Sequence, residues 1–161
     1  GLVGESMGAA TVLQHMEIDS RAAFIHADCP YSNVGDLYTH QLKLHHIPQF
    51  MRSMTLYYCD RYLKRHCGFS LHDVNPAAAA AGSSTPLFLA HGTADTYVPT
   101  YMSRAIAEKR SPATDTYLYL AENAAHAKAL PEDPAAYRRE LFRFLDAYVD
   151  IPDTPTPAAS I

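Results

Sequence analysis

Short apolar runs alternate with helical patterns along the chain. Residues 1–5, 22–27, 86–90 and 115–120 are brief apolar or Tyr- and Thr-rich segments that end in turn residues, as buried strands do. Small and apolar residues over 7–16 suit a buried helix directly after the first strand. Strands that alternate with helices predict an α/β fold with about four mostly parallel strands.

Two further helices flank the later strands. Pro99 opens a helical pattern that extends to Lys109, because Pro is favoured in a first helical turn. Asp133 and Pro134 form an N-cap and first-turn pair. After them, apolar residues recur at helical spacing and predict a C-terminal helix with one buried stripe, which consists of Tyr137, Leu141, Phe144, Leu145 and Tyr148.

The segment 35–72 contains no convincing strand and is rich in His, Tyr, Leu and Met. It predicts two helices, 35–46 and 49–66, separated near Pro48. Its apolar residues either wall an acyl pocket or pack the segment onto the body; they are Phe50, Met51, Met54, Leu56, Tyr57 and Tyr58. Its histidines, His40, His45 and His46, fit a solvated helix face better than a substrate entrance.

Composition and charge narrow the possible partners. The 161 residues are 48% hydrophobic and 19% charged with a net charge of −4, which is ordinary for one folded domain. No basic patch stands out, so nucleic acid and anionic membranes are poor candidates, and no membrane-spanning segment occurs. The chain starts at Gly1 without a signal peptide, which says little about the intact protein. The expected location is the cytoplasm, and a signal or anchor before Gly1 stays open.

The cysteines and histidines indicate neither a disulfide framework nor a metal site. Cys29, Cys59 and Cys67 are odd in number and irregularly spaced, which predicts reduced and mostly buried thiols. A pair between Cys59 and Cys67 stays open only for an exported protein. The nine histidines are scattered, and neither CxxC nor HExxH occurs.

One short motif carries candidate chemistry. Gly4-Glu5-Ser6-Met7-Gly8 is a G-x-S-x-G pattern between an apolar strand and a small-residue helix. In such a strand-to-helix turn a serine projects as a nucleophile, and we expect Gly4 and Gly8 to prevent side-chain collisions. The helix N-terminus would then offer the Met7 N–H to a developing oxyanion.

A serine nucleophile requires a base and an orienting acid. Asp95 follows the apolar strand 86–90, and His126 follows the strand 115–120. The order Ser, Asp, His is that of serine hydrolases built on α/β sheets. Because carboxyl ends of parallel strands meet at one edge, we expect these three side chains to lie together.

The sequences GESMGA, HGTADTYVP and NAAHA resemble the α/β-hydrolase superfamily, near the bacterial esterases and prolyl-oligopeptidase-like serine hydrolases. The resemblance covers residues 1–150 and implies the C-terminal half of such a fold. It places 35–72 where the superfamily inserts a helical cap or lid. The three prolines within 151–161 predict a flexible tail there.

Carried over to this chain, the resemblance implies Ser6 as nucleophile, His126 as base, Asp95 as acid and the Met7 amide as one oxyanion donor. The second donor of the family lies upstream of the elbow, outside these residues. Asp28 is the alternative acid, and its other possible role is in a turn or a helix cap. His72 and His91 are alternatives for the base, and the other possible role of His91 is to shape the loop that bears Asp95, which we call the acid loop. Glu5 is expected to be structural.

The expected function is hydrolysis of carboxylic esters through an acyl-enzyme, with no metal or cofactor and a small-molecule ester or peptide as substrate. A peptidase or amidase of the prolyl-oligopeptidase type stays open, because it would use the same triad. The third hypothesis is an inactive fragment that needs its N-terminal half and self-associates through an exposed sheet edge.

Overall fold

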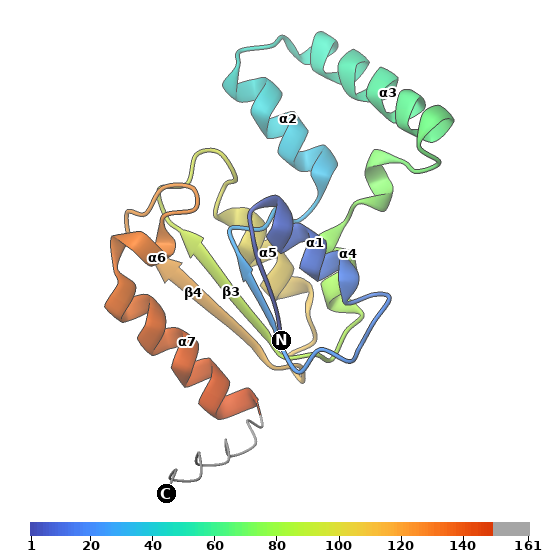
Figure 1. Cartoon of the computed structure of the whole chain (residues 1–161). Helices are drawn as coiled ribbons and strands as arrows, with labels where there is room; N and C mark the ends of the chain where they lie inside the picture. The colour runs from blue at the N-terminus through green and yellow to red at the C-terminus, as the bar shows by residue number, and fades with distance from the viewer. Residues whose placement is uncertain (150–161) are drawn as a thin grey trace, which may run out of the picture.

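The computed structural model describes residues 1–149, in which four parallel strands form one sheet in chain order (Figure 1). The strands are β1 (Leu2–Glu5), β2 (Ile25–Asp28), β3 (Leu87–Gly92) and β4 (Thr116–Ala121). Their register aligns the ends, since Glu5 lies opposite Asp28 and Asp28 lies opposite Ala90. The predicted α/β fold with four parallel strands is therefore confirmed.

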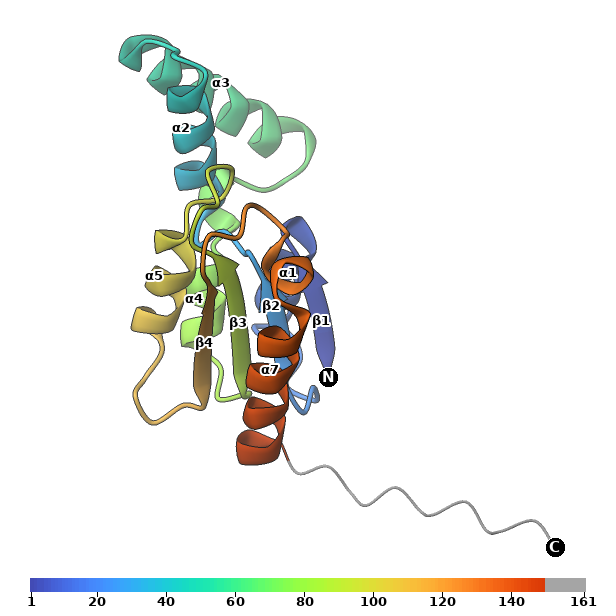
Figure 2. The ribbon, with the colours of Figure 1, turned by 90° about the vertical axis from the view of Figure 1, so that its left-hand side faces the viewer.

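Helices cover both faces of this sheet. On one face α1 (Met7–His15), α4 (Pro76–Ala81) and α5 (Tyr101–Lys109) pack against the alternate β3 residues Leu87 and Leu89. On the other face α7 (Pro134–Tyr148) and the short α6 (Ala129–Glu132) pack against Phe88 and Ala90 (Figure 2). The period-2 alternation of a strand thus gives each face its own apolar core.

The predicted C-terminal helix is confirmed in its cap and in most of its stripe. The Asp133 carboxylate accepts a hydrogen bond from the Ala136 N–H at 2.9 Å. Tyr137 and Phe144 are buried, but Tyr148 is 39% exposed at the last turn. The expected tail at 151–161 lies outside the described residues.

The predicted helical pair is α2 (Val34–Leu44) and α3 (Gln49–His66), which we call the α2–α3 hairpin. Figures 1 and 2 show it standing beyond the carboxyl edge of the sheet. Asn33 caps α2 by accepting from the Gly35 and Asp36 N–H groups, and Pro48 precedes α3. The contacts of α3 are mainly with α2 and with the 3₁₀ turn η1 (Leu71–Asp73).

The prediction that the thiols are mostly buried is wrong. Cys29 is buried, but Cys59 and Cys67 are exposed, and all three are free. Cys59 lies on α3 and Cys67 directly follows it, and no residue of α3 is buried. In residues 1–149, no helix is both long and apolar enough to cross a bilayer.

Candidate active site

Ser6 lies in a strained turn between β1 and α1. Its φ of 53° and ψ of −115° fall where non-glycine residues are rare, a cost of about 1–3 kcal/mol. Two backbone hydrogen bonds hold this conformation: the Ser6 N–H donates to the Asp28 carbonyl at 2.8 Å, and the Ala10 N–H donates to the Ser6 carbonyl at 3.1 Å. The turn therefore depends on the neighbouring strand β2.

The two glycines of the motif differ. A Cβ on Gly4 would lie 2.3 Å from the Gly8 carbonyl oxygen, so only glycine fits there without a backbone shift. A Cβ on Gly8 would meet no atom within 4 Å. The expectation that both positions require glycine is wrong for Gly8, because its side-chain direction points out of the first turn of α1 into open space.

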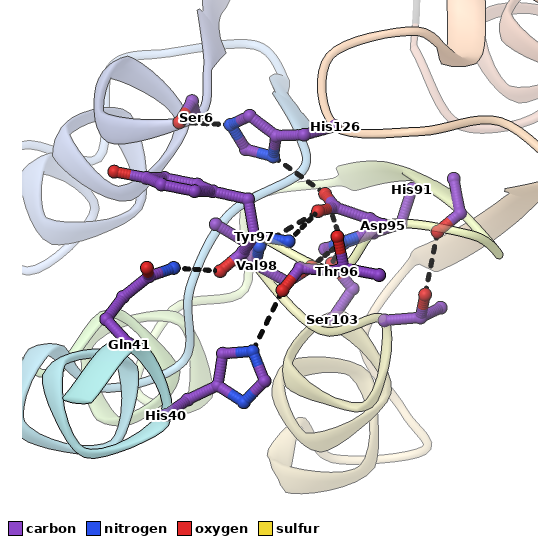
Figure 3. A network of polar contacts seen from close by, with 12 residues as sticks. Ser6, His40, Gln41, His91, Asp95, Thr96, Tyr97, Val98, Ser103 and His126 are labelled. Carbon is purple, nitrogen blue, oxygen red and sulfur yellow. Dashed lines mark hydrogen bonds and ion pairs between the residues drawn. The ribbon is translucent and has the colours of Figure 1, made fainter. Parts of the chain in front are cut away.

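Ser6, His126 and Asp95 form one chain of hydrogen bonds (Figure 3). The Asp95 Oδ2 lies 2.7 Å from His126 Nδ1, and His126 Nε2 lies 2.9 Å from Ser6 Oγ. A carboxylate only accepts, so Nδ1 carries a proton, and Nε2 lies where it can accept from the serine hydroxyl. The structure thus brings the three predicted residues together from the ends of three different strands.

Asp95 is held by three donors in a buried position. Its Oδ1 accepts from the Tyr97 and Val98 N–H groups at 2.9 Å each, and its Oδ2 accepts from His126 and lies 3.2 Å from His91 Nε2. Burial acts to raise the pKa of Asp95, but the interactions with His91, His126 and Val98 outweigh it and lower the pKa. The carboxylate is therefore ionised and fixed in place.

His91 does not replace His126 but supports the acid loop, the alternative expected for it. The His91 ring is fully buried and lies 2.6 Å from Ser103 Oγ through Nδ1 and 2.8 Å from the Val98 carbonyl through Nε2. Since a carbonyl accepts, Nε2 carries the proton and Nδ1 accepts from the Ser103 hydroxyl. His91 thereby links α5 to the loop that carries Asp95.

The loop that bears His126 packs against the acid loop at Gly92. A Cβ on Gly92 would lie 2.1 Å from the Ala124 carbonyl oxygen, so this close approach requires glycine. Asn123 and Ala127, on either side of His126, have φ of 56° and 55°. In the part of the chain that the structure describes, five non-glycine residues have positive φ, and four of them lie at this site: Ser6, Cys29, Asn123 and Ala127.

The alternative acid, Asp28, lies in a separate buried network. Its Oδ2 accepts from the Tyr137 hydroxyl at 2.9 Å, and that hydroxyl lies 2.6 Å from His26 Nε2. Burial raises the pKa of Asp28 and lowers that of His26 to about 4. Among residues 1–149 the buried Asp28 Oδ1 has no hydrogen-bond partner, so Asp28 does not orient His126.

Three further residues that the sequence singled out are Met7 and Glu5, which flank the nucleophile, and His72. Met7 is the first residue of α1, where a helix leaves its N–H groups without intrahelical acceptors, as an oxyanion donor requires. Glu5 ends β1 and is exposed. His72, the other rival base, is exposed in η1.

One set of side-chain atoms at this site has the spacing of metal ligands. Cys29 Sγ, an Asp95 oxygen and a His126 nitrogen lie within 4.8 Å of one another. Burial raises the pKa of the Cys29 thiol to about 12, which disfavours the thiolate that a metal needs. The Asp95 and His126 atoms already bind each other at 2.7 Å, so a metal would compete with the hydrogen-bond chain.

The α2–α3 hairpin reaches the site through backbone carbonyls of the acid loop. His40 Nε2 lies 2.9 Å from the Thr96 carbonyl, and Gln41 Nε2 donates to the Tyr97 carbonyl at 2.5 Å (Figure 3). The centre of the Tyr97 ring lies 5.0 Å from the centre of the His126 ring. His40 thus contacts the loop that bears Asp95, whereas the sequence had favoured a solvated helix face for it. A contact between residues 56 positions apart leaves no periodic pattern from which it could be predicted.

A groove of about 690 Å³ lies between α2, α3 and the loops below them. Its walls are mostly aromatic and aliphatic and include Tyr31, Tyr38, Leu42, Leu56, Tyr58, Tyr62 and Phe69. Of the residues expected either to wall a pocket or to pack on the body, Leu56 and Tyr58 line this groove. Phe50, Met51 and Met54 are exposed at 72%, 39% and 50%.

Comparison with known proteins places this geometry in context. No protein-family model matches the chain. The uncharacterized protein YqkD of Bacillus subtilis is 31% identical over 150 residues, which cover 91% of this chain and 47% of that protein.

Solved structures share the fold at lower identity. A Pyrococcus furiosus esterase, Pf2001, has a TM-score of 0.66 at 19% identity, over 92% of this chain and 53% of the other. The esterase domain of a Rhodothermus marinus protein has a TM-score of 0.62 at 15% identity, and the match covers 92% of this chain and 62% of the other. An acylaminoacyl peptidase from Pyrococcus horikoshii has a TM-score of 0.66 at 15% identity, and the match covers 92% of this chain and 24% of the other.

These relatives are longer than the chain, which spans about half the length of YqkD and of the Pyrococcus furiosus esterase. The match to the Pyrococcus furiosus esterase nevertheless covers 92% of this chain. The chain therefore has the α/β-hydrolase fold.

Proposed function

We propose that the protein is a serine hydrolase that cleaves carboxylic esters with Ser6, His126 and Asp95. The observation that carries the proposal is the continuous hydrogen-bond chain from Ser6 Oγ through both ring nitrogens of His126 to the buried Asp95 carboxylate. Such a chain is what a nucleophile, its base and an orienting acid need. The esterases among the structural relatives support it at the level of fold.

In the proposed reaction, Ser6 Oγ attacks the ester carbonyl while His126 Nε2 takes the hydroxyl proton. Asp95 keeps the proton on Nδ1 and stabilises the imidazolium that forms. The Met7 N–H donates to the oxyanion of the tetrahedral intermediate. The imidazolium then protonates the leaving alkoxide, which leaves an acyl-Ser6 ester, and a water activated by His126 releases the acid.

The direct test is labelling with a fluorophosphonate, which phosphonylates an activated serine. We expect the full-length protein to be labelled, Ser6→Ala to lose labelling, and the exposed Ser53→Ala on α3 to retain it. Labelling that survives Ser6→Ala would exclude Ser6 as the nucleophile.

A peptidase or amidase is the second candidate, favoured by the structural similarity to an acylaminoacyl peptidase. The same three residues would act, but the leaving group would be an amine. The ratio of kcat/KM for matched p-nitrophenyl ester and p-nitroanilide substrates separates the two, and a preference for the anilide would replace the esterase proposal.

The proposal extends to association through β1. Among the described residues this strand pairs on one side only, with β2, and Val3 is 66% exposed. An open parallel edge accepts a further strand, from the rest of a longer protein or from a second copy. We expect residues 1–161 alone to associate or to show little turnover, and a monomer with full esterase turnover would contradict this.

A further inference from the structure

The α2–α3 hairpin concentrates the exposed apolar side chains of the molecule. Of the seventeen large hydrophobic residues that are exposed within residues 1–149, eight lie in residues 34–66: Tyr38, Leu44, Phe50, Met51, Met54, Tyr57, Tyr58 and Tyr62. Exposed large apolar side chains that gather in one segment point to an interaction surface.

The hairpin is also basic in an acidic chain. Residues 34–66 contain five Lys or Arg and two Asp, a formal charge of +3. Because the whole chain carries −4, the remaining residues sum to −7. The net charge of the chain therefore averages over two regions of opposite sign, and the expectation against anionic membranes, which rested on the absence of a basic patch, overlooked this basic segment.

On α3 the two properties fall on one strip. At 100° per residue, one arc of less than a quarter turn contains Phe50, Met54, Tyr57, Arg61 and Arg65, all exposed. We call these five residues the hairpin face. The half-buried residues of α3 lie on the opposite side, and the Arg61 guanidinium carbon lies 5.9 Å from the centre of the Tyr57 ring.

We propose that the hairpin face docks the protein on an anionic lipid surface. Aromatic and thioether side chains insert at the boundary between headgroups and acyl chains, while arginines keep their charge among phosphates as their stems cover apolar surface. Basic groups near the surface add attraction to anionic lipids. A second copy of the chain fits this face poorly, because two faces that each carry Arg61 and Arg65 would repel each other.

The position of the hairpin gives the docking a direction. α3 lies beyond the carboxyl edge of the sheet, the edge that bears Ser6, Asp95 and His126 (Figures 1 and 3). The docked protein would thus turn this edge toward the lipid. The docking itself rests on the exposure and charge of the hairpin, not on the proposed hydrolysis.

The test is co-sedimentation of the full-length protein with vesicles of phosphatidylcholine alone or with one-quarter phosphatidylglycerol. We expect binding to the anionic vesicles, little binding to the neutral ones, and weakening as salt rises. Arg61→Glu with Arg65→Glu should lower the bound fraction at least tenfold. Arg104→Glu with Lys109→Glu on α5, an equal charge change at exposed positions, should leave it within twofold.

A second pair of variants tests insertion rather than charge attraction alone. Phe50→Ser with Tyr57→Ser should lower binding to anionic vesicles and make the remainder more sensitive to salt. Circular dichroism and fluorophosphonate labelling check that each variant is folded, so loss of binding with retained labelling separates this surface from the triad. Absence of binding to anionic vesicles, equal losses in both charge-reversal pairs, or concentration-dependent dimers that the hairpin variants abolish would overturn the proposal.

Discussion

The carboxyl edge of the sheet and the α2–α3 hairpin are neighbours built in opposite ways. At the sheet edge, Asp95 and His91 are buried and multiply hydrogen-bonded, and strained turns sit between rigid strands. In the hairpin, α3 buries no residue and is held mainly by α2 and η1. Fixed geometry, which chemistry needs, is found where polar groups are buried and paired, and adaptable contact area is found where they are not.

The largest expected effect tests the choice of acid at the sheet edge. Asp95→Asn should lower kcat by on the order of 10⁴, because an amide in place of the carboxylate favours the wrong His126 tautomer and cannot stabilise the imidazolium. Asp28→Asn is the matched variant, since Asp28 contacts Tyr137 and not His126. Steady-state ester hydrolysis measures kcat for both variants. A larger loss of kcat from Asp28→Asn would identify Asp28, at the end of β2, as the acid in place of Asp95.

The next effect concerns backbone clearance. Gly4→Ala should destabilise the fold by about 1–3 kcal/mol or more, because its Cβ would overlap the Gly8 carbonyl. Gly8→Ala should be neutral or slightly stabilising, since alanine favours helix and no atom lies near. Urea unfolding measures both, and equal losses would show that the two positions are equivalent after all.

His26 makes the stability of the body depend on pH. Burial lowers its pKa to about 4, so between about pH 6.5 and 4 the unfolded chain binds a proton there and the folded chain does not. The free energy of unfolding should therefore fall as pH drops through this window, by up to about 3 kcal/mol.

His26→Gln is the control for that window, because it keeps a polar partner for Tyr137 without titrating. Urea unfolding at pH 7 and pH 4.5 should show a smaller difference for this variant than for the natural chain. An identical difference would assign the pH dependence to other groups.

The smallest global effect is expected in the hairpin. The Asp60 carboxylate accepts from Ser70 Oγ at 2.8 Å and from the Leu71 N–H at 2.9 Å, and lies 2.9 Å from Lys64 Nζ. Hydrogen bonds from Lys64 and Ser70 lower the pKa of Asp60 to about 2. The stabilisation from these interactions of the Asp60 carboxylate is thus fully present above about pH 4 and is lost as pH falls toward 2.

Asp60→Ala should therefore speed hydrogen exchange in α3 while the thermal midpoint of the body barely changes. The neighbouring exposed Ser53→Ala should leave exchange unaltered. A large drop in the thermal midpoint with Asp60→Ala would show that the hairpin and the body unfold as one unit.

Sequence reasoning predicted the strands, most helices and the candidate triad for a simple reason. Parallel strands place the loops after them at one edge, so Ser6, Asp95 and His126 could be placed by order alone. It could not predict contacts without a period, such as Tyr137 with Asp28, which lie 109 residues apart. The freedom at Gly8 depends on a side-chain direction that only the fold fixes. The positive charge of residues 34–66, by contrast, can be counted in the sequence.

The sheet adds its strands in the order in which they are made. Each strand of residues 1–149 can thus pair with its predecessor as it leaves the ribosome, at about 5–20 residues per second. Ser6, however, meets its histidine 120 residues later. The candidate nucleophile would be inert until His126 has been made and folded into place, and the onset of fluorophosphonate labelling would time that step.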